Sequence, residues 1–180
     1  MSGARQVKML FDEQTIAERN KTLALEIAAS KPKDLLVVAV LKGSFMFAAD
    51  LIRALHRVGL EPHVEFIHLS SYREGTVSSG TVRILRDIES SIKDRDVLLV
   101  DDILESGRTL AFAKDLLVAR GARRVMICTM LEKPGKRAVQ IAADFVGFAC
   151  PDVFVVGYGM DVAHSYRELP FIGHVVMEGE

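Results

Sequence analysis

The stretch Val97-Leu98-Leu99-Val100-Asp101-Asp102-Ile103-Leu104-Glu105-Ser106-Gly107-Arg108-Thr109-Leu110 decides the fold. Its four leading apolar residues, 97–100, are typical of a strand buried on both faces, as in a parallel sheet covered by helices. Two carboxylates follow where we expect this strand to end. The pattern of 110–119 is helical, and Gly121 is the expected stop of that helix. The sequence therefore predicts a strand, a loop and a helix in direct succession.

The loop at 105–109 has the composition of a phosphate site. A loop that leads into a helix offers unpaired backbone N–H groups and the positive end of the helix dipole, and Gly107 lets an anion come close. Asp101 and Asp102 would repel the same phosphate, so they need sugar hydroxyls or Mg²⁺ as partners. The stretch predicts a sugar phosphate as ligand. A receiver-type Mg²⁺ site is the alternative, which the phosphate loop disfavours.

The composition is that of an ordinary globular protein. The 180 residues are enough for one domain with a real core, and 49% of them are hydrophobic and 26% charged. Twenty-three basic and 24 acidic residues give a net charge of -1, which indicates no general attraction to nucleic acid or anionic membranes. Two cysteines, no apolar signal core and a longest apolar run of 35–41 predict a cytoplasmic protein without a disulfide framework.

Strand and helix patterns alternate along the rest of the chain, as expected for an α/β fold. Helices are predicted at 13–30, where Thr15 and Glu18 have capping-box spacing, and at 44–58. The inner face of the second helix is predicted to consist of Phe45, Ala48, Ala49, Ile52 and Leu55. Further strands are predicted at 35–41, 63–69, 82–85, 123–131 and 172–177.

Several polar or aromatic positions allow two interpretations each. The Ser- and Gly-rich segment 70–81 is either a functional lid or an extended hairpin tip, and composition alone favours neither. Lys42 follows a strand at the edge that faces the ligand crevice in such sheets, although a lone lysine there is more often solvated. A basic segment such as 133–137 is usually solvated too. Phe154 is either a core residue or an aromatic that stacks on a flat base.

Four motifs in order resemble the hypoxanthine-guanine phosphoribosyltransferases, which are type I phosphoribosyltransferases of purine salvage. They are Leu41-Lys42-Gly43, the pair Ser71-Tyr72, the strand with its acidic pair and Ser-Gly-x-Thr loop at 97–109, and the string 154–161. The resemblance implies one domain, 1–180, with a doubly wound, mainly parallel sheet flanked by helices as its core at about 35–150. A small hood is implied from about 1–12 and 151–180, and a mobile loop at about 70–82.

The resemblance also implies an activity, the Mg²⁺-dependent transfer of a 5-phosphoribosyl group from phosphoribosyl pyrophosphate to N9 of hypoxanthine or guanine. The products are IMP or GMP and pyrophosphate. The implied donor-binding residues are Leu41, Lys42, Gly43, Asp101, Asp102, Glu105, Ser106, Gly107, Arg108, Thr109 and Arg167. The implied purine-binding residues are Lys133, Phe154, Val155 and Asp161, and the implied metal ligands are Asp101, Asp102 and Asp161.

The catalytic residues implied by the resemblance are Glu105, Lys42, Arg167, Ser71 and Tyr72. Ser71 and Tyr72 open the loop that would exclude water from a ribosyl cation. The family that the Leu41-Lys42-Gly43 loop resembles has a cis bond before this lysine, which the sequence alone does not establish. Glu105 departs from the family pattern, which has aspartate as the candidate base near N7 of the purine. The extra methylene moves the carboxylate by on the order of 1 Å, a displacement that can matter to proton transfer.

The expected partners are small molecules and further copies of the chain, as a homodimer or homotetramer, and neither nucleic acid nor a membrane. Lys133 has donors but no acceptor, which favours a 6-oxopurine over adenine. Two alternatives stay open at this point: a xanthine-preferring enzyme of the same fold, and a regulator that keeps the fold but binds nucleic acid.

Overall fold

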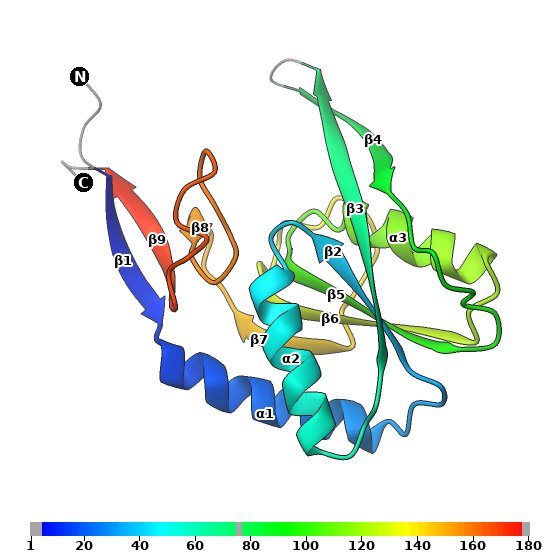
Figure 1. Ribbon diagram of the computed structural model, residues 1–180. Coiled ribbons are helices and arrows are strands. Elements are labelled where there is room, and N and C mark those ends of the chain that lie inside the picture. Colours follow the sequence, from blue (N-terminus) through cyan, green and yellow to red (C-terminus); the bar gives the residue numbers. More distant parts are fainter. Residues whose placement is uncertain (1–4, 75–76, 178–180) are drawn as a thin grey trace.

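The computed structural model describes residues 5–74 and 77–177. Among these residues, six strands form a sheet in the order β4-β3-β2-β5-β6-β7 (Figure 1). They are β2 (Leu36–Leu41), β3 (His63–Glu74), β4 (Val77–Arg86), β5 (Asp96–Leu104), β6 (Arg124–Glu132) and β7 (Phe145–Ala149). β4 pairs antiparallel with β3, and every other neighbouring pair is parallel. The predicted mainly parallel sheet is confirmed.

Helices cover both faces of this sheet because its central strands are apolar on both sides. α1 (Glu13–Ala29) and α2 (Phe45–Arg57) pack with Val37 and Ala39 of β2 in one core. α3 (Arg108–Ala119) packs with Val38 and Val40 in the other. Alternate residues of one strand thus enter opposite cores, which confirms the doubly wound architecture.

A second sheet joins the two ends of the chain. β1 (Arg5–Phe11) pairs antiparallel with β9 (Ile172–Met177), which also pairs with the short β8 (Val155–Val156). Figure 1 shows this sheet standing apart from the main sheet, on the side where α1 begins. Nowhere in the described ranges does a helix combine the length and the hydrophobicity that crossing a membrane requires.

Two predictions about the helices are wrong in detail. α1 is capped by Asp12, whose carboxylate accepts a 2.7 Å hydrogen bond from the Thr15 amide, so Thr15 does not start a capping box. The buried face of α2 consists of Phe47, Ala48, Leu51, Ala54 and Leu55. Phe45, Ala49 and Ile52 are only partly buried, because the stripe that begins at Phe47 is the one directed at the sheet.

One predicted strand end is also wrong. β5 continues through its carboxylates to Leu104, because β6 goes on pairing with it, as Asp101 with Thr129. β2 pairs with β5 only as far as Val100, so the carboxylates lie where β2 has already turned away. Of the two interpretations of 70–81, the extended hairpin is observed, since β3 runs to Glu74 and β4 starts at Val77, whereas the mobility of this segment stays a prediction. Gly75 and Thr76 lie outside the described residues.

Asp96 fixes the opposite edge of the sheet, where β5 begins. Its fully buried carboxylate accepts a 2.8 Å hydrogen bond from the Lys33 amide and pairs with Arg123 and, at 2.9 Å, with Arg124. Burial raises the pKa of Asp96, but the Lys33 amide and the two arginines lower it by more, so the carboxyl titrates below its ordinary value. This cluster is structural and lies away from the carboxylates of the predicted site.

Candidate active site

The Lys-Gly loop after β2 and the acidic pair of β5 lie in direct contact. A Cβ atom added to Gly43 would stand 1.9 Å from Oδ2 of Asp102, so no side chain fits here while the Asp102 carboxylate keeps its position. Glycine, which has no Cβ, allows this close approach. The peptide bond between Leu41 and Lys42 is cis, as in the family that the loop resembles, and the Lys42 side chain is exposed. The structure thus brings Lys42, Gly43 and the acidic pair to one edge of the sheet.

The two carboxylates are held in a poorly solvated position. Asp101 is 9% exposed, and burial followed by the neighbouring charge of Asp102 raises its pKa well above the ordinary value. Burial also raises the pKa of Asp102, although the Asp101 side chain and the charge of Arg167 act in the opposite direction. Asp102 is partly exposed, but two adjacent carboxylates with so little solvent are stable as anions only beside a cation or several donors, which is what a metal or ribose hydroxyls would supply.

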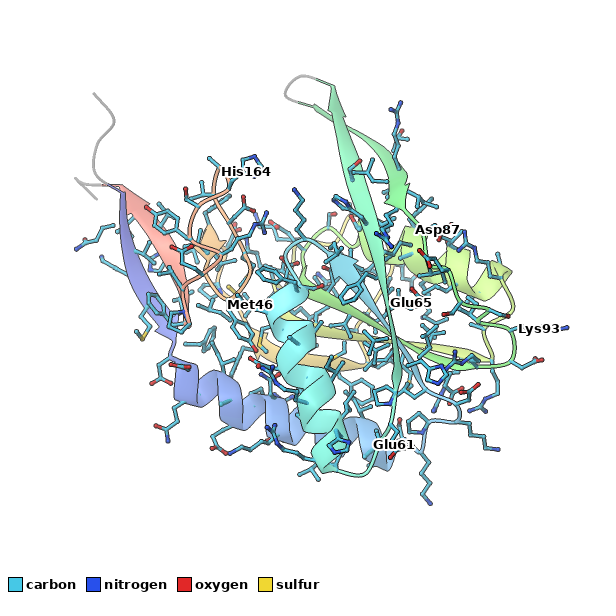
Figure 2. The ribbon with its side chains drawn as sticks, in the orientation of Figure 1. Met46, Glu61, Glu65, Asp87, Lys93 and His164 are labelled. Atoms are coloured by element: carbon cyan, nitrogen blue, oxygen red, sulfur yellow. The ribbon has the colours of Figure 1, made fainter. Side chains whose placement is uncertain are left out.

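The third predicted metal ligand has protein partners of its own. Oδ1 of Asp161 is 2.8 Å from the Arg167 guanidinium, and Oδ2 accepts a 2.7 Å hydrogen bond from the His164 amide. Figure 2 shows His164 at the outer end of the loop that contains Asp161. Within residues 5–74 and 77–177, no three His, Cys, Asp or Glu side chains are grouped closely enough to hold a metal. The Asp101–Asp102 pair fits Mg²⁺ of the kind that takes one or two carboxylates and completes its shell with water and substrate phosphates.

Arg167 links this loop to the rest of the site. Its guanidinium donates a 2.6 Å hydrogen bond to the Gly159 carbonyl, and the Gly159 amide donates to the Arg167 carbonyl at 3.0 Å. Gly159 in turn is pressed against Gly43, because a Cβ on Gly159 would be 2.4 Å from the Gly43 carbonyl oxygen. The segment 157–167 and the Lys-Gly loop therefore pack backbone to backbone.

The predicted phosphate loop encloses a small cavity at the start of α3. The cavity has a volume of about 210 Å³ and is lined by residues 101–107, Thr109 and Leu110. Gly107 is the N-cap of α3, so the amides of the first helical turn are directed toward this end of the helix. The loop therefore offers an anion both space and donors.

Arg137 binds the backbone of the predicted phosphate loop, a role that the sequence did not indicate. Its guanidinium donates to the carbonyls of Leu104 at 3.0 Å and Glu105 at 2.7 Å, and it pairs with Glu132. The prediction that the basic segment is simply solvated is wrong for this residue. It holds for Lys136, which is exposed and pairs with Asp152, and no sequence pattern distinguishes the two cations.

The predicted purine end of the site is built from β6 and the segment before β8. Lys133 is 7% exposed, and its ammonium lies 3.4 Å from Oε1 of Glu105. Phe154 is 56% exposed, so the interpretation of this ring as a core residue is wrong. Val155 is buried and pairs with His174 of β9, which leaves the Phe154 ring at the surface beside an ordered strand.

Two of the predicted catalytic residues cannot be placed in the site. The backbone of Ser71 and Tyr72 belongs to β3, where Ser71 pairs with Val82, but their side chains lie outside the described part of the structure. Ser106 lies in the loop after β5 as predicted, whereas Arg108 and Thr109 already belong to α3, which begins two residues before the predicted start of the helix.

Known proteins are similar to this chain over nearly its whole length. Residues 6–163 match the phosphoribosyl transferase domain family. The hypoxanthine phosphoribosyltransferase of Escherichia coli K12 is 40% identical over 177 residues, which cover 97% of this chain and 98% of that protein. The bifunctional protein TilS/HprT of Listeria monocytogenes serotype 4b is 45% identical over 167 residues, 92% of this chain. The chain spans about a quarter of that longer protein, 25%.

A solved structure agrees with these matches. The hypoxanthine-guanine phosphoribosyltransferase of Bacillus anthracis, with a HEPES molecule in its active site, superposes with a TM-score of 0.89 at 43% identity. The superposition covers 95% of this chain and 100% of that one. Sequence and structure lead to the same conclusion, that the chain belongs to the phosphoribosyltransferase family and, within it, to the hypoxanthine-guanine phosphoribosyltransferases.

Proposed function

We propose that the protein transfers the 5-phosphoribosyl group of phosphoribosyl pyrophosphate to N9 of hypoxanthine or guanine, forming IMP or GMP and pyrophosphate. One observation carries the proposal: the backbone of Gly43 lies between the Asp102 carboxylate and Gly159, whose carbonyl is bound by Arg167. Three segments that are far apart in the sequence thus place carboxylates, a lysine loop and an arginine around one point. That set suits a ligand with a polyol in its middle and phosphates at both ends.

Each part of the donor has matching groups. Asp101 and Asp102 hold the ribose hydroxyls, and the amides and hydroxyls of 106–109 bind the 5′-phosphate in the cavity before α3. The Leu41-Lys42-Gly43 loop and Arg167 bind the pyrophosphate and stabilise the charge that it gains on leaving. When bound by Asp101 and Asp102, with Asp161 near the pyrophosphate, Mg²⁺ supplies further positive charge to the leaving group.

The acceptor base lies between Phe154 and the β6 edge. Phe154 stacks on the purine ring, Lys133 donates to its 6-oxo group, and the Val155 backbone binds its edge. The bond from C1′ to the pyrophosphate oxygen breaks, and its electron pair leaves with pyrophosphate while the N9 lone pair forms the new bond. Glu105 takes the proton that the purine ring loses. Ser71 and Tyr72, on the β3–β4 hairpin, close over C1′ and keep water from it.

The proposal extends to the compartment and to assembly. Both cysteines, Cys128 and Cys150, are buried thiols, and burial raises the pKa of each, which suits the reducing cytoplasm that we propose. A homodimer or homotetramer is proposed from the resemblance, and light scattering of the purified chain measures it directly.

A spectrophotometric assay with phosphoribosyl pyrophosphate and Mg²⁺ tests the function when hypoxanthine, guanine, xanthine and adenine are supplied separately. Turnover of hypoxanthine or guanine without adenine activity is expected. A clear preference for xanthine would replace the proposal by its nearest alternative. Binding of the donor without turnover of any base would instead favour a regulator of this fold.

Two variants of Glu105 test its role as base. Glu105→Gln keeps the shape of the side chain but cannot take a proton, whereas Glu105→Asp keeps the carboxylate and shortens its reach. We expect kcat to fall by roughly 100-fold in the first and by much less in the second, in line with the usual contribution of a general base. Full turnover by the glutamine variant would assign the role to another group.

A further inference from the structure

Tyr158 occupies an unusual backbone position within the proposed pyrophosphate site. Three successive residues, Gly157, Tyr158 and Gly159, have left-handed φ angles of 91°, 51° and 99°. Glycine adopts such angles freely, but a side-chain-bearing residue is strained there and keeps the conformation only when its surroundings hold it. The tyrosine is therefore held in place by specific contacts.

The hydroxyl of Tyr158 makes those contacts with both helices on one face of the sheet. It accepts a 3.0 Å hydrogen bond from Nδ2 of Asn20 in α1 and donates a 2.6 Å hydrogen bond to Oδ2 of Asp50 in α2. Tyr158 is 7% exposed and Asn20 is 4% exposed. Burial, followed by the hydrogen bond to Asp50, raises the pKa of the phenol, so it stays protonated and remains a donor.

The backbone on both sides of Tyr158 holds the charged groups of the turn. The Tyr158 amide donates to the Leu169 carbonyl at 2.9 Å, and Gly159 exchanges hydrogen bonds with Arg167. Arg167 in turn pairs with Asp161 at 2.8 Å. A displacement of Tyr158 therefore moves the turn that carries both charged side chains.

The helix that receives the hydroxyl also carries the other half of the site. α2 begins at Phe45, directly after the Lys42–Ser44 loop, and Asp50 lies in its second turn. Figure 2 shows Met46, in the first turn of α2, on the side of the helix that faces the 157–170 segment. A helix moves as a rigid unit over so short a distance, so a bond to Asp50 fixes the turn relative to the Lys-Gly loop.

We propose that Tyr158 is a positioning residue, whose bonds to Asn20 and Asp50 hold Arg167 and Asp161 at the correct separation from the Lys42-Gly43 loop for binding pyrophosphate. The inference rests on the proposed function, because it concerns the pyrophosphate end of that site. Tyr158 itself touches no substrate. Its contribution should therefore appear in the binding of pyrophosphate and of its ribosyl donor, and not in the binding of the purine.

The variant Tyr158→Phe tests this inference, with Tyr166→Phe as the matched control. Both remove one phenolic hydroxyl from the same segment, but only the first breaks the link to Asp50. We expect Tyr158→Phe to raise the KM for phosphoribosyl pyrophosphate and the Kd for Mg²⁺-pyrophosphate by roughly tenfold, the effect of one buried hydrogen bond to a charged group. The KM for hypoxanthine and kcat should change less than about twofold, within the precision of such comparisons.

A further variant, Asp50→Asn, keeps an oxygen acceptor for the hydroxyl and should preserve most of the pyrophosphate affinity. A lower melting temperature of Tyr158→Phe with unchanged KM and Kd would overturn the inference, as would equal losses for donor and purine. Calorimetric titration with Mg²⁺-pyrophosphate does not require turnover. Suppose that the unaltered protein transferred nothing to any base, and that the Tyr158→Phe variant bound pyrophosphate less tightly than the unaltered protein. The proposed function would then fail, and the positioning role would stand.

Discussion

Replacement of Gly43 by alanine should weaken binding of the donor much more than it lowers the stability of the fold. The new Cβ would lie 1.9 Å from Oδ2 and 2.7 Å from Cγ of Asp102, so the carboxylate has to rotate away from its present position. Because the displaced atoms are the end of one side chain, the free energy of unfolding should fall by only about 0.5–1.5 kcal/mol, the cost of an off-rotamer side chain. Loss of one charged hydrogen-bond partner costs about 1.5–3 kcal/mol, which weakens donor binding roughly 10- to 150-fold.

The assay is a calorimetric titration of Mg²⁺-phosphoribosyl pyrophosphate into four proteins: the unaltered chain, Gly43→Ala, Asp102→Ala and the double variant. If the added methyl group acts by displacing the Asp102 carboxylate, Gly43→Ala should have almost no effect once that carboxylate is absent. Equal losses in both backgrounds would show that the methyl group acts by another route. Unchanged affinity of the single variant would refute the contact itself.

Three other substitutions test separate parts of the structure. Asp96→Asn should lower the free energy of unfolding by about 3 kcal/mol, because Arg123 and Arg124 lose the buried charge between them. The pKa of Asp96 in the folded protein is below its unfolded value of about 3.9, so its contribution to stability is present above that pH and is lost as the pH falls through the folded pKa. The free energy of unfolding, measured between pH 6 and 3, should therefore depend less on pH in the variant than in the unaltered protein. Parallel pH profiles would contradict this. Arg137→Met keeps the apolar stem but loses the donors to two loop carbonyls, so the KM for the donor should rise about tenfold in steady-state kinetics, and an unchanged KM would argue against loop support. Phe154→Ala should raise the KM for hypoxanthine roughly tenfold without lowering the melting temperature, because the ring is exposed, and a large loss of stability would return Phe154 to the core.

The main elements of the fold could be predicted because buried parallel strands have an unmistakable composition. Runs such as 36–41 and 97–100 are apolar on both faces, and only a sheet covered by two helical layers buries both. The same uniformity explains the error in α2. Nearly every residue from Phe45 to Leu55 is apolar or small, so the sequence does not specify which stripe of the helix faces the sheet.

The hairpin at β3 and β4 was only one of two interpretations of its sequence, for the opposite reason. Residues 70–82 are polar, and the β3–β4 ribbon extends beyond the sheet, where no core imposes an apolar and polar alternation (Figure 1). Composition there supported a loop as well as a strand. Pairing between the two strands, as of Ser70 with Arg83, decides the structure, and such pairing is not visible in either segment alone.

Groups of the site that share one motif could be predicted, whereas contacts between motifs could not. The acidic pair and the 105–109 loop are adjacent in the chain, so a site for a sugar phosphate could be proposed there from the sequence alone. The approach of Gly43 to Asp102 joins two strands, and the support of the loop by Arg137 crosses 32 residues. These contacts depend on the order of strands in the sheet, which hydrophobic periodicity does not encode.

Glu105 shows how such a contact changes the meaning of a single substitution. The sequence identifies only a longer carboxylate in place of the expected aspartate, and the structure sets it 3.4 Å from the ammonium of Lys133. That lysine is almost fully buried and needs an acceptor, since a buried unpaired charge is costly. In the structure Glu105 is the acceptor of this lysine. We propose that the 6-oxo group of a bound purine would replace it and leave the carboxylate available for the ring proton. On this proposal Lys133 has an acceptor both with and without the purine, and binding of the base exchanges one acceptor for the other.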